Sequence, residues 1–202
     1  VAHLVGFDLQ LAARQLIFHR MMAGVALVTA VGLTGWGVFS ALRGPRLKPI
    51  EVVLPQLPPA LDGFTIAQIS DLHVGQTINK PYVEGVAAQV SSAKPDLVVI
   101  TGDMVDNTPS VIADDVAPLS TIQSKYGTYY VTGNHEYYAG VGPWLKWLPA
   151  NNIRVLRNRS VRIGPPQAQF ELIGVDDSWA WPGGAEELAV VDQLLRRPRD
   201  ET

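Results

Sequence analysis

The sequence predicts an α/β sandwich with mixed β-sheets, preceded by a transmembrane helix. Three short apolar runs, rich in β-branched or aromatic residues, predict buried strands over residues 64–69, 97–100 and 128–131. A polar motif follows each run, and successive motifs are spaced by 32 and 31 residues, about one strand, crossover helix and strand per step. If these strands are parallel neighbours, their carboxyl ends open on one edge of the sheet, where open α/β folds place their sites.

The N-terminal part predicts a membrane anchor. Residues 21–42 carry no charge over 22 positions, and at about 1.5 Å per residue such a helix crosses a hydrocarbon core of about 30 Å. Buried helices rarely stay uncharged for this length, and the apolar part of a signal peptide spans only about 7 to 15 residues. Residues 1–20 fit a membrane-proximal segment, in which 8–20 form a connecting or interfacial helix and 1–7 fit the end of an earlier span.

Charge is distributed unevenly along the chain. Residues 1–50 hold five basic residues and one acidic residue, a net charge of +4, which leaves −7 for the rest of a chain whose formal charge is −3. This division suits an anionic lipid surface beside an acidic, metal-loading domain. Basic residues stand in nearly equal number on both sides of the span, so charge does not orient it. The sequence shows no basic stripe interleaved with aromatic residues near the motifs, so no nucleic acid partner is expected.

The domain that follows the span begins near residue 48. Proline and glycine punctuation and the period of the apolar residues predict its remaining elements. We expect an edge strand at 48–54, helices at 81–92, 109–122 and 144–150, strands at 153–156, 160–163 and 170–175, and a helix at 186–195. Pro118 lies inside the second of these helices, so that helix is expected to be kinked or broken.

The three polar motifs carry residues that can bind metal ions. They are Ser70-Asp-Leu-His73, Thr101-Gly-Asp103 and Gly133-Asn-His-Glu136. Asp71 and His73 alternate along an expected extended segment, so both can face one cation while Leu72 points into the core. The chain has no cysteine, so any metal must use carboxylate, imidazole or amide oxygen. Each motif alone consists of residues that are common in turns, but three such motifs at strand ends together indicate half of a two-metal site.

The motifs D-x-H, G-D and G-N-H-E, each after a strand, resemble the signature of the calcineurin-like metallophosphoesterases. The similarity continues upstream through residues 54–58 and 61–64 into 68–75, which look like the membrane-associated branch of that family. Roughly residues 48 to 180 are covered. The resemblance implies a phosphoesterase sandwich, with mixed β-sheets flanked by helices, over residues 48–202.

The resemblance also implies roles for individual residues. Asp71 and His73 match ligands of one metal ion, Asp103 matches the carboxylate that bridges two ions, and Asn134 matches the amide ligand of the second. His135 matches the catalytic residue that donates a proton to a phosphoryl oxygen or the leaving group. Glu136 is expected to orient its neighbours rather than bind metal. The expected cofactors are two divalent ions, and the mixed nitrogen and oxygen ligands suit manganese, iron or zinc.

The sequence departs from the family pattern after Glu136. The family continues with further histidines that complete both metal sites, whereas no histidine follows His135 here. We therefore expect an incomplete chain that is inactive by itself, and the first residue, Val1 rather than methionine, suggests the same at the start. Asp106, Asn107, Asp176 and Asp177 remain without a ligand role and are expected on turns or the surface.

Two functions of different classes compete. The first is a membrane-anchored dinuclear phosphoesterase that hydrolyses phosphodiester or pyrophosphate bonds. A lipid-linked substrate is favoured because the domain begins within six residues of the span. The second is an inactive membrane-bound regulatory or scaffold domain that kept the fold. Four tryptophans, at 144, 147, 179 and 181, either pack in the core or form aromatic loops that hold an acyl chain or sugar.

Overall fold

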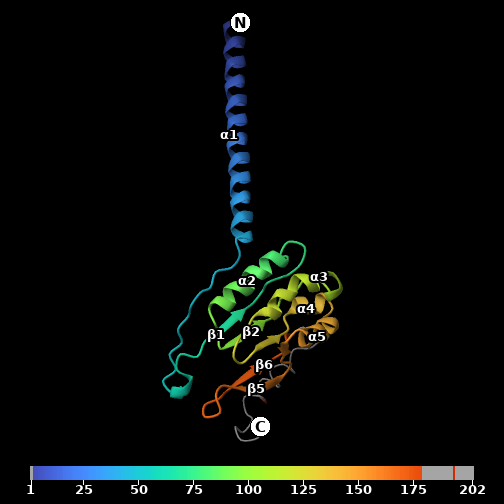
Figure 1. Cartoon of the computed structure of the whole chain (residues 1–202). Coiled ribbons are helices and arrows are strands. Elements are labelled where there is room, and N and C mark those ends of the chain that lie inside the picture. Colours follow the sequence, from blue (N-terminus) through green and yellow to red (C-terminus); the bar gives the residue numbers. More distant parts are fainter. Residues whose placement is uncertain (1, 179–192, 194–202) are drawn as a thin grey trace. The chain divides into compact units, whose positions relative to one another are not determined.

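The computed structural model describes residues 2–178 and Gln193 and divides into two units, Val1–Gly44 and Pro45–Thr202. The first unit is one unbroken helix, α1 (Ala2–Leu42), of 41 residues (Figure 1). Within its part from Leu11 to Leu42, an 18-residue window reaches a mean hydropathy of 1.8 and has no buried residue, so by length and composition this part is a candidate membrane span. No break separates residues 8–20 from residues 21–42, because no proline interrupts them.

The second unit is built on a four-stranded parallel sheet in the order β1-β2-β3-β4; Figure 1 labels its first two strands. The strands are β1 (Ile66–Ile69), β2 (Leu97–Thr101), β3 (Thr128–Val131) and β4 (Ile153–Val155). Ile69 lies opposite Ile100 in the register, and Thr101 lies opposite Val131. The expected strands and their parallel order are therefore confirmed, and the three polar motifs leave the sheet at one edge.

Helices cover one face of this sheet. They are α2 (Lys80–Ser92), α3 (Pro109–Val116), the short 3-10 helix η2 (Ala117–Thr121), α4 (Asn134–Tyr138) and α5 (Val141–Ala150). The expected break near Pro118 is confirmed, since the α-helix ends at Val116 and a 3-10 turn carries the proline. Apolar side chains at helical spacing on α2 enter the core with those of the other helices; the members from α2 are Val83, Val86, Ala87 and Val90.

A second, two-stranded antiparallel sheet lies on the opposite face. It consists of β5 (Arg159–Ile163) and β6 (Phe170–Gly174), paired with Arg159 opposite Gly174 and Ile163 opposite Phe170. Ile163 packs in one apolar cluster with Leu97 and Tyr129 of the parallel sheet. The described part of the second unit is thus layered as helices, parallel sheet and antiparallel sheet, in agreement with the predicted α/β sandwich.

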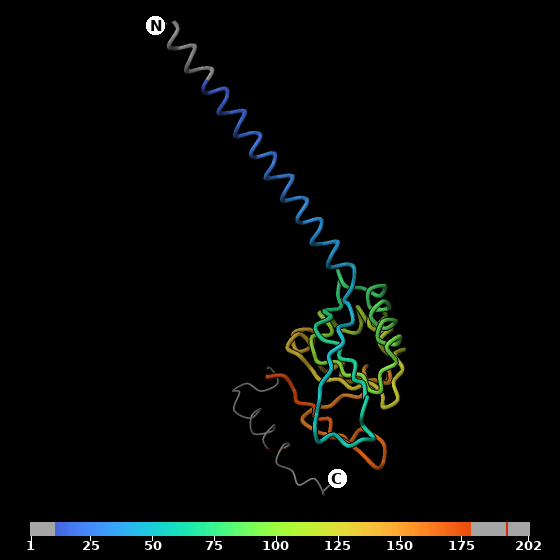
Figure 2. The backbone as a smooth tube through the Cα atoms, turned by 90° about the vertical axis from the view of Figure 1, so that its left-hand side faces the viewer, coloured from blue at the N-terminus to red at the C-terminus, as the bar shows by residue number. Residues whose placement is uncertain are grey.

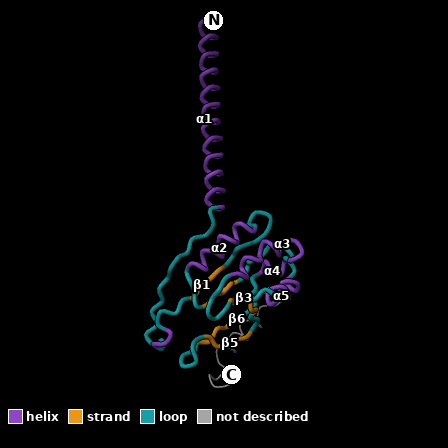
Figure 3. The backbone as a smooth tube through the Cα atoms, viewed as in Figure 1, coloured by secondary structure: helices purple, strands orange, loops and turns teal. Residues whose placement is uncertain are grey.

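One expected strand is absent from the described residues. Residues 48–54 form an irregular stretch between α1 and β1, drawn as a loop in Figures 2 and 3. Ile50, Val52 and Val53 are exposed there, with 69–77% of their surface accessible. The expectation of an edge strand was wrong because no described strand lies beside this segment to accept its backbone hydrogen bonds. The short 3-10 helix η1 (Pro59–Leu61) then leads towards β1.

The tryptophans divide between described and undescribed parts of the chain. Trp144 is fully buried and its indole N–H donates to the carbonyl oxygen of Asn107 at 2.8 Å. Trp147 packs against the same core, with its ring 5.4 Å from that of Trp144. Both are core residues, as one of the two alternatives expected. Trp179, Trp181 and the expected helix at 186–195 lie outside the described residues, apart from Gln193.

Candidate metal centre

The loop after β1 runs along the loop after β2, held by backbone hydrogen bonds. The N–H of Asp71 donates to the carbonyl oxygen of Gly102 at 3.2 Å, and that of His73 donates to the carbonyl oxygen of Asp103 at 3.0 Å. Val74 continues the pairing with a bond of 2.9 Å to Met104. The first two polar motifs are therefore side by side, as the parallel order of their strands predicted.

The backbone at three ligand-type residues is left-handed. Asp71, His73 and Asp103 have φ angles of +55°, +50° and +49°, a region that residues with a side chain seldom occupy. The extended segment expected for Asp71 and His73 is therefore wrong, because the chain turns sharply at each of them. Leu72 between them is buried, with 8% of its surface exposed, so its expected direction into the core is confirmed. Such strain is characteristic of functional sites.

The second and third motifs approach each other so closely that both need glycine. Gly102 has a φ angle of +79°, and a Cβ atom there would lie 2.6 Å from the backbone nitrogen of Gly133. A Cβ atom on Gly133 would in turn collide with the side chain of Asp103. Because both glycines lack a side chain, the loop after β2 and the turn before α4 can touch through their backbones.

Glu136 joins these two loops from inside the protein. Its side chain is fully buried, and its carboxylate accepts hydrogen bonds from the N–H groups of Met104 at 2.8 Å and Asp103 at 3.0 Å. It also accepts from Gly133 at 2.7 Å and from Val105 at 3.3 Å. The expectation that Glu136 orients its neighbours matches this arrangement, in which one carboxylate accepts from four backbone donors, two of them buried and two half-buried.

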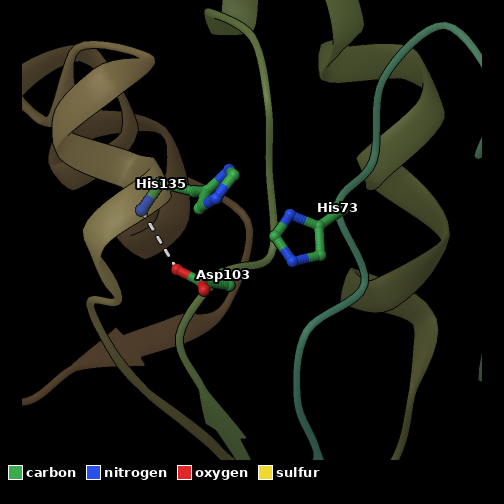
Figure 4. A group of neighbouring side chains, drawn as sticks. All are labelled: His73, Asp103 and His135. Atoms are coloured by element: carbon green, nitrogen blue, oxygen red, sulfur yellow. Dashed lines mark hydrogen bonds between the residues drawn. The ribbon is translucent and has the colours of Figure 1, made fainter.

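Three side chains from the three motifs converge at the edge of the sheet. His73, Asp103 and His135 each offer one ligand atom, and these atoms lie within 4.8 Å of one another. Figure 4 shows the two imidazoles and the carboxylate facing a common space, with the backbone N–H of His135 donating to Oδ1 of Asp103 at 3.0 Å. The rings of His73 and His135 meet edge to face with centroids 4.3 Å apart. All three residues are half-buried, so an ion could reach them from solvent.

A further carboxylate, Asp106, lies between the two imidazoles. Its Oδ1 is 2.9 Å from Nδ1 of His73 and 2.7 Å from Nδ1 of His135. Burial alone would raise the pKa of Asp106, but the hydrogen bonds and charges of His73 and His135 outweigh burial and hold it below its ordinary value. For His73, burial would lower the pKa, but the hydrogen bond and charge of Asp106, with Asp103 and Asp71, raise it overall.

Sequence reasoning missed Asp106, which was expected on a turn or at the surface. The residue is indeed exposed, but its backbone N–H donates to the carbonyl oxygen of Val74 at 3.0 Å, which places it beside His73. The only signal in the sequence was its position three residues after Asp103, in the loop that leaves the same strand end. That signal does not distinguish a loop that returns to the site from one that runs into solvent.

The remaining predicted ligands lie at the same edge. Asp71 is exposed, its Oδ2 accepts a hydrogen bond from the Ser70 hydroxyl, and it stands outside the group of three. Asn134 is half-buried and begins α4, directly after Gly133. His135 belongs to the group of three, so its position suits a ligand as well as a substrate contact.

The donor set limits the metal ions that would fit. Two imidazoles and one carboxylate suit borderline divalent ions such as manganese, iron or zinc. The neighbouring Asp71 carboxylate and Asn134 amide supply harder oxygen donors. The residues at this edge therefore fit a divalent metal ion, in agreement with the chemistry expected from the sequence.

Comparisons with known proteins agree with this geometry. The profile of the calcineurin-like phosphoesterase family matches residues 64–200. A bovine protein named "Transmembrane protein with metallophosphoesterase domain" is 34% identical over 165 residues, which cover 81% of this chain and 36% of that protein. The zebrafish (Danio rerio) protein of the same name is 31% identical over 157 residues, 76% of this chain and 36% of that protein.

A bacterial protein is similar to this chain to about the same degree. An uncharacterized metallophosphoesterase of Helicobacter pylori is 34% identical over 144 residues, 71% of this chain and 37% of that protein. The chain thus spans little more than a third of the length of these curated relatives. No solved structure matches it.

Proposed function

The chain belongs to the calcineurin-like phosphoesterase family, and from that premise we propose that it supplies part of the active site of a membrane-anchored, metal-dependent phosphoesterase. The observation that supports this most strongly is the convergence of His73, Asp103 and His135, within 4.8 Å, from three strand ends. The proposed reaction is hydrolysis of a phosphodiester or pyrophosphate bond.

We assign the metal ligands as the motifs suggest. Asp71 and His73 would hold one divalent ion, Asp103 would contribute to both ions, and Asn134 would hold the second. Bound divalent ions at such sites polarise the phosphoryl group and lower the pKa of water, which makes hydroxide available at neutral pH. The contribution of this chain is to present these donors from a rigid sheet edge, with Glu136 holding the loops that carry Asp103 and Asn134.

His135 is the proposed proton donor to the leaving group. Its backbone is tied to Asp103, and its Nδ1 faces Asp106 at 2.7 Å. When Nδ1 carries a proton that Asp106 accepts, Nε2 is the ring atom left to exchange a proton with the substrate. Asp106 would therefore set the tautomer and the direction of the ring.

The proposed substrate is a phosphoester with a lipid part. The support is that α1 is apolar enough to cross a membrane and that the catalytic unit follows it along the chain almost directly. Two relatives carry the word transmembrane in their names. A substrate held in the bilayer would be concentrated at the surface to which the catalytic unit is attached.

A second function, an inactive regulatory or scaffold domain, applies if the rest of the protein adds no metal ligands, since these 202 residues hold no histidine after His135. With so few imidazoles, the second ion would depend on Asp103 and Asn134, and its affinity would be low. A regulatory or scaffold domain catalyses no reaction, so a weakly bound second ion would not impair it. We expect the 202-residue chain by itself to be inactive under both functions.

The experiment that separates these functions uses the protein expressed from its complete gene and purified in detergent. We expect elemental analysis to find divalent metal, and turnover of a chromogenic phosphodiester and of a lipid phosphoester after manganese is added. A preference for the lipid would support the proposed substrate. Absence of both bound metal and turnover, with the fold intact by circular dichroism, would favour the scaffold function instead.

A further inference from the structure

An ion pair between the buried carboxylate of Asp176 and the exposed guanidinium of Arg157 lies beside the turn that carries Asn134 and His135. Asp176 follows β6, and its side chain is 2% exposed. The guanidinium of Arg157 faces it with two nitrogens: Nε lies 2.9 and 2.8 Å from the two carboxylate oxygens, and Nη2 lies 2.7 Å from Oδ2. Asn158 completes the arrangement, because its side-chain oxygen accepts the N–H of Asp176 at 3.0 Å and its amide nitrogen lies 3.4 Å from Oδ2.

The same carboxylate reaches the end of β3. The hydroxyl of Thr132, a residue that is 4% exposed, lies 3.4 Å from Oδ1 of Asp176 and 3.2 Å from the hydroxyl of Tyr137 on α4. Thr132 directly precedes Gly133, whose N–H is held by Glu136. Asp176 therefore contacts the residue at which the chain leaves the sheet and enters the turn.

We propose that Arg157 and Asp176 are positioning residues, which fix the turn from Thr132 to Glu136 so that Asn134 and His135 keep their places at the metal edge. This inference rests on the phosphoesterase function proposed above. Neither residue lies within the group of His73, Asp103 and His135. Their effect on the reaction is transmitted through Thr132 and the backbone of the turn.

The geometry favours this role over a purely structural one. The Glu136 carboxylate links the turn to the loop after β2, because it accepts from the N–H groups of both Gly133 and Asp103. The Asp176 carboxylate links the start of the turn to the second sheet through the Thr132 hydroxyl. The turn is therefore restrained by contacts with two different parts of the unit. This ion pair is weak support for stability, because desolvation of the buried Asp176 carboxylate offsets much of its attraction to the partly exposed Arg157, but the two-nitrogen contact restrains the direction of the carboxylate well. The network thus supplies orientation at a place where small displacements change catalytic rates.

The test compares three variants of the protein expressed from its complete gene. Asp176→Asn removes the charge but keeps the shape. Arg157→Leu with Asp176→Leu removes both charges together, so that neither partner is left as an unpaired charge. The matched control is Arg154→Gln, because the Arg154 guanidinium also donates hydrogen bonds, to the Tyr129 hydroxyl at 2.7 Å and to the carbonyl oxygen of Tyr126 at 3.3 Å, neither of which belongs to the turn.

Hydrogen exchange of the turn gives a readout that does not need activity. In Asp176→Asn and in the double variant, we expect the amides of Gly133 and His135 to exchange about 10-fold faster or more, while those of β2 stay within about 2-fold of the unchanged protein. The Arg154→Gln control should leave the turn amides unchanged. Equal acceleration over the whole domain would show a global loss of stability and would overturn the positioning role.

Kinetics give the second readout. We expect kcat for a chromogenic phosphodiester to fall about 10-fold or more in both pair variants, with KM within about 2-fold. Protected turn amides together with normal kcat in the double variant would overturn the inference. If the unchanged protein shows no turnover, the proposed function fails, while the exchange experiment still decides whether the pair fixes the turn.

Discussion

Asp106 and His135 are in direct contact at the metal edge, with Oδ1 of the carboxylate 2.7 Å from Nδ1 of the imidazole. The same oxygen also lies 2.9 Å from Nδ1 of His73. One exposed carboxylate therefore holds the rings of two residues that come from different strand ends. Because Nδ1 of each ring contacts Asp106, Nε2 is the ring nitrogen available to an ion or a substrate.

The first prediction concerns this carboxylate. Asp106→Asn should lower turnover of a phosphodiester by about 10-fold or more, because an amide holds an imidazole less firmly than a carboxylate does. Asp114→Asn, an exposed substitution on α3, is the control and should leave turnover unchanged. Steady-state kinetics at saturating manganese checks this. Turnover equal to that of the control would mean that Asp106 has no part in positioning the rings.

The second prediction concerns the shared ligand. Asp103→Ala should reduce the content of both metal ions measured by elemental analysis, because its carboxylate is the one proposed to serve both. Asp71→Ala should affect mainly one ion. Asp62→Ala, at the exposed end of η1, is the control. Metal content and turnover that survive Asp103→Ala would contradict the bridging assignment.

The third prediction separates the two roles that the position of His135 allows. His135→Ala should lower turnover by about 10²-fold or more while metal content stays near normal, as expected when a proton donor is lost. His73→Ala should lower both together. Parallel loss of metal and turnover in His135→Ala would make His135 a ligand, in line with its place in the group of three.

The fourth prediction concerns stability rather than chemistry. Glu136→Gln replaces a carboxylate that accepts four backbone hydrogen bonds with an amide that has only one acceptor oxygen. The free energy of unfolding should fall by about 2 kcal/mol or more, since buried donors lose a charged acceptor. Glu84→Gln on the exposed side of α2 should change it by less than about 0.5 kcal/mol. Urea unfolding checks both values; equal stability of the two variants would contradict the role of Glu136.

The sequence predicted the sheet and the meeting of its three motifs because both follow from local patterns. Apolar runs such as Leu97–Thr101 mark buried strands, and parallel strands open at one edge. It could not predict the left-handed turns at Asp71 and His73, since these arise from the pairing of two loops distant in sequence. Side chains alternate between two faces only within a strand, and β1 ends at Ile69. The alternation therefore does not extend to Asp71 and His73.

Long-range contacts also explain what sequence reasoning missed. Asp106 reaches His135 across 29 residues, and Asp176 reaches Thr132 across 44. Neither pairing has a local signature, because each depends on the path of a loop after its strand. The strand expected at 48–54 failed for a related reason: β-type residues form a strand only where a partner edge is present.

The last prediction concerns the anchor. Helix α1 exposes apolar side chains along Leu11–Leu42, so a protein that keeps residues 1–47 should stay in the membrane fraction through washes with high salt and with carbonate. A shortened chain that begins at Lys48 should leave that fraction, because the second unit forms its own core without α1. Fractionation followed by immunoblotting checks both. Release of the longer form by salt alone would show that electrostatic attraction to lipid holds it, and the transmembrane assignment would then be wrong.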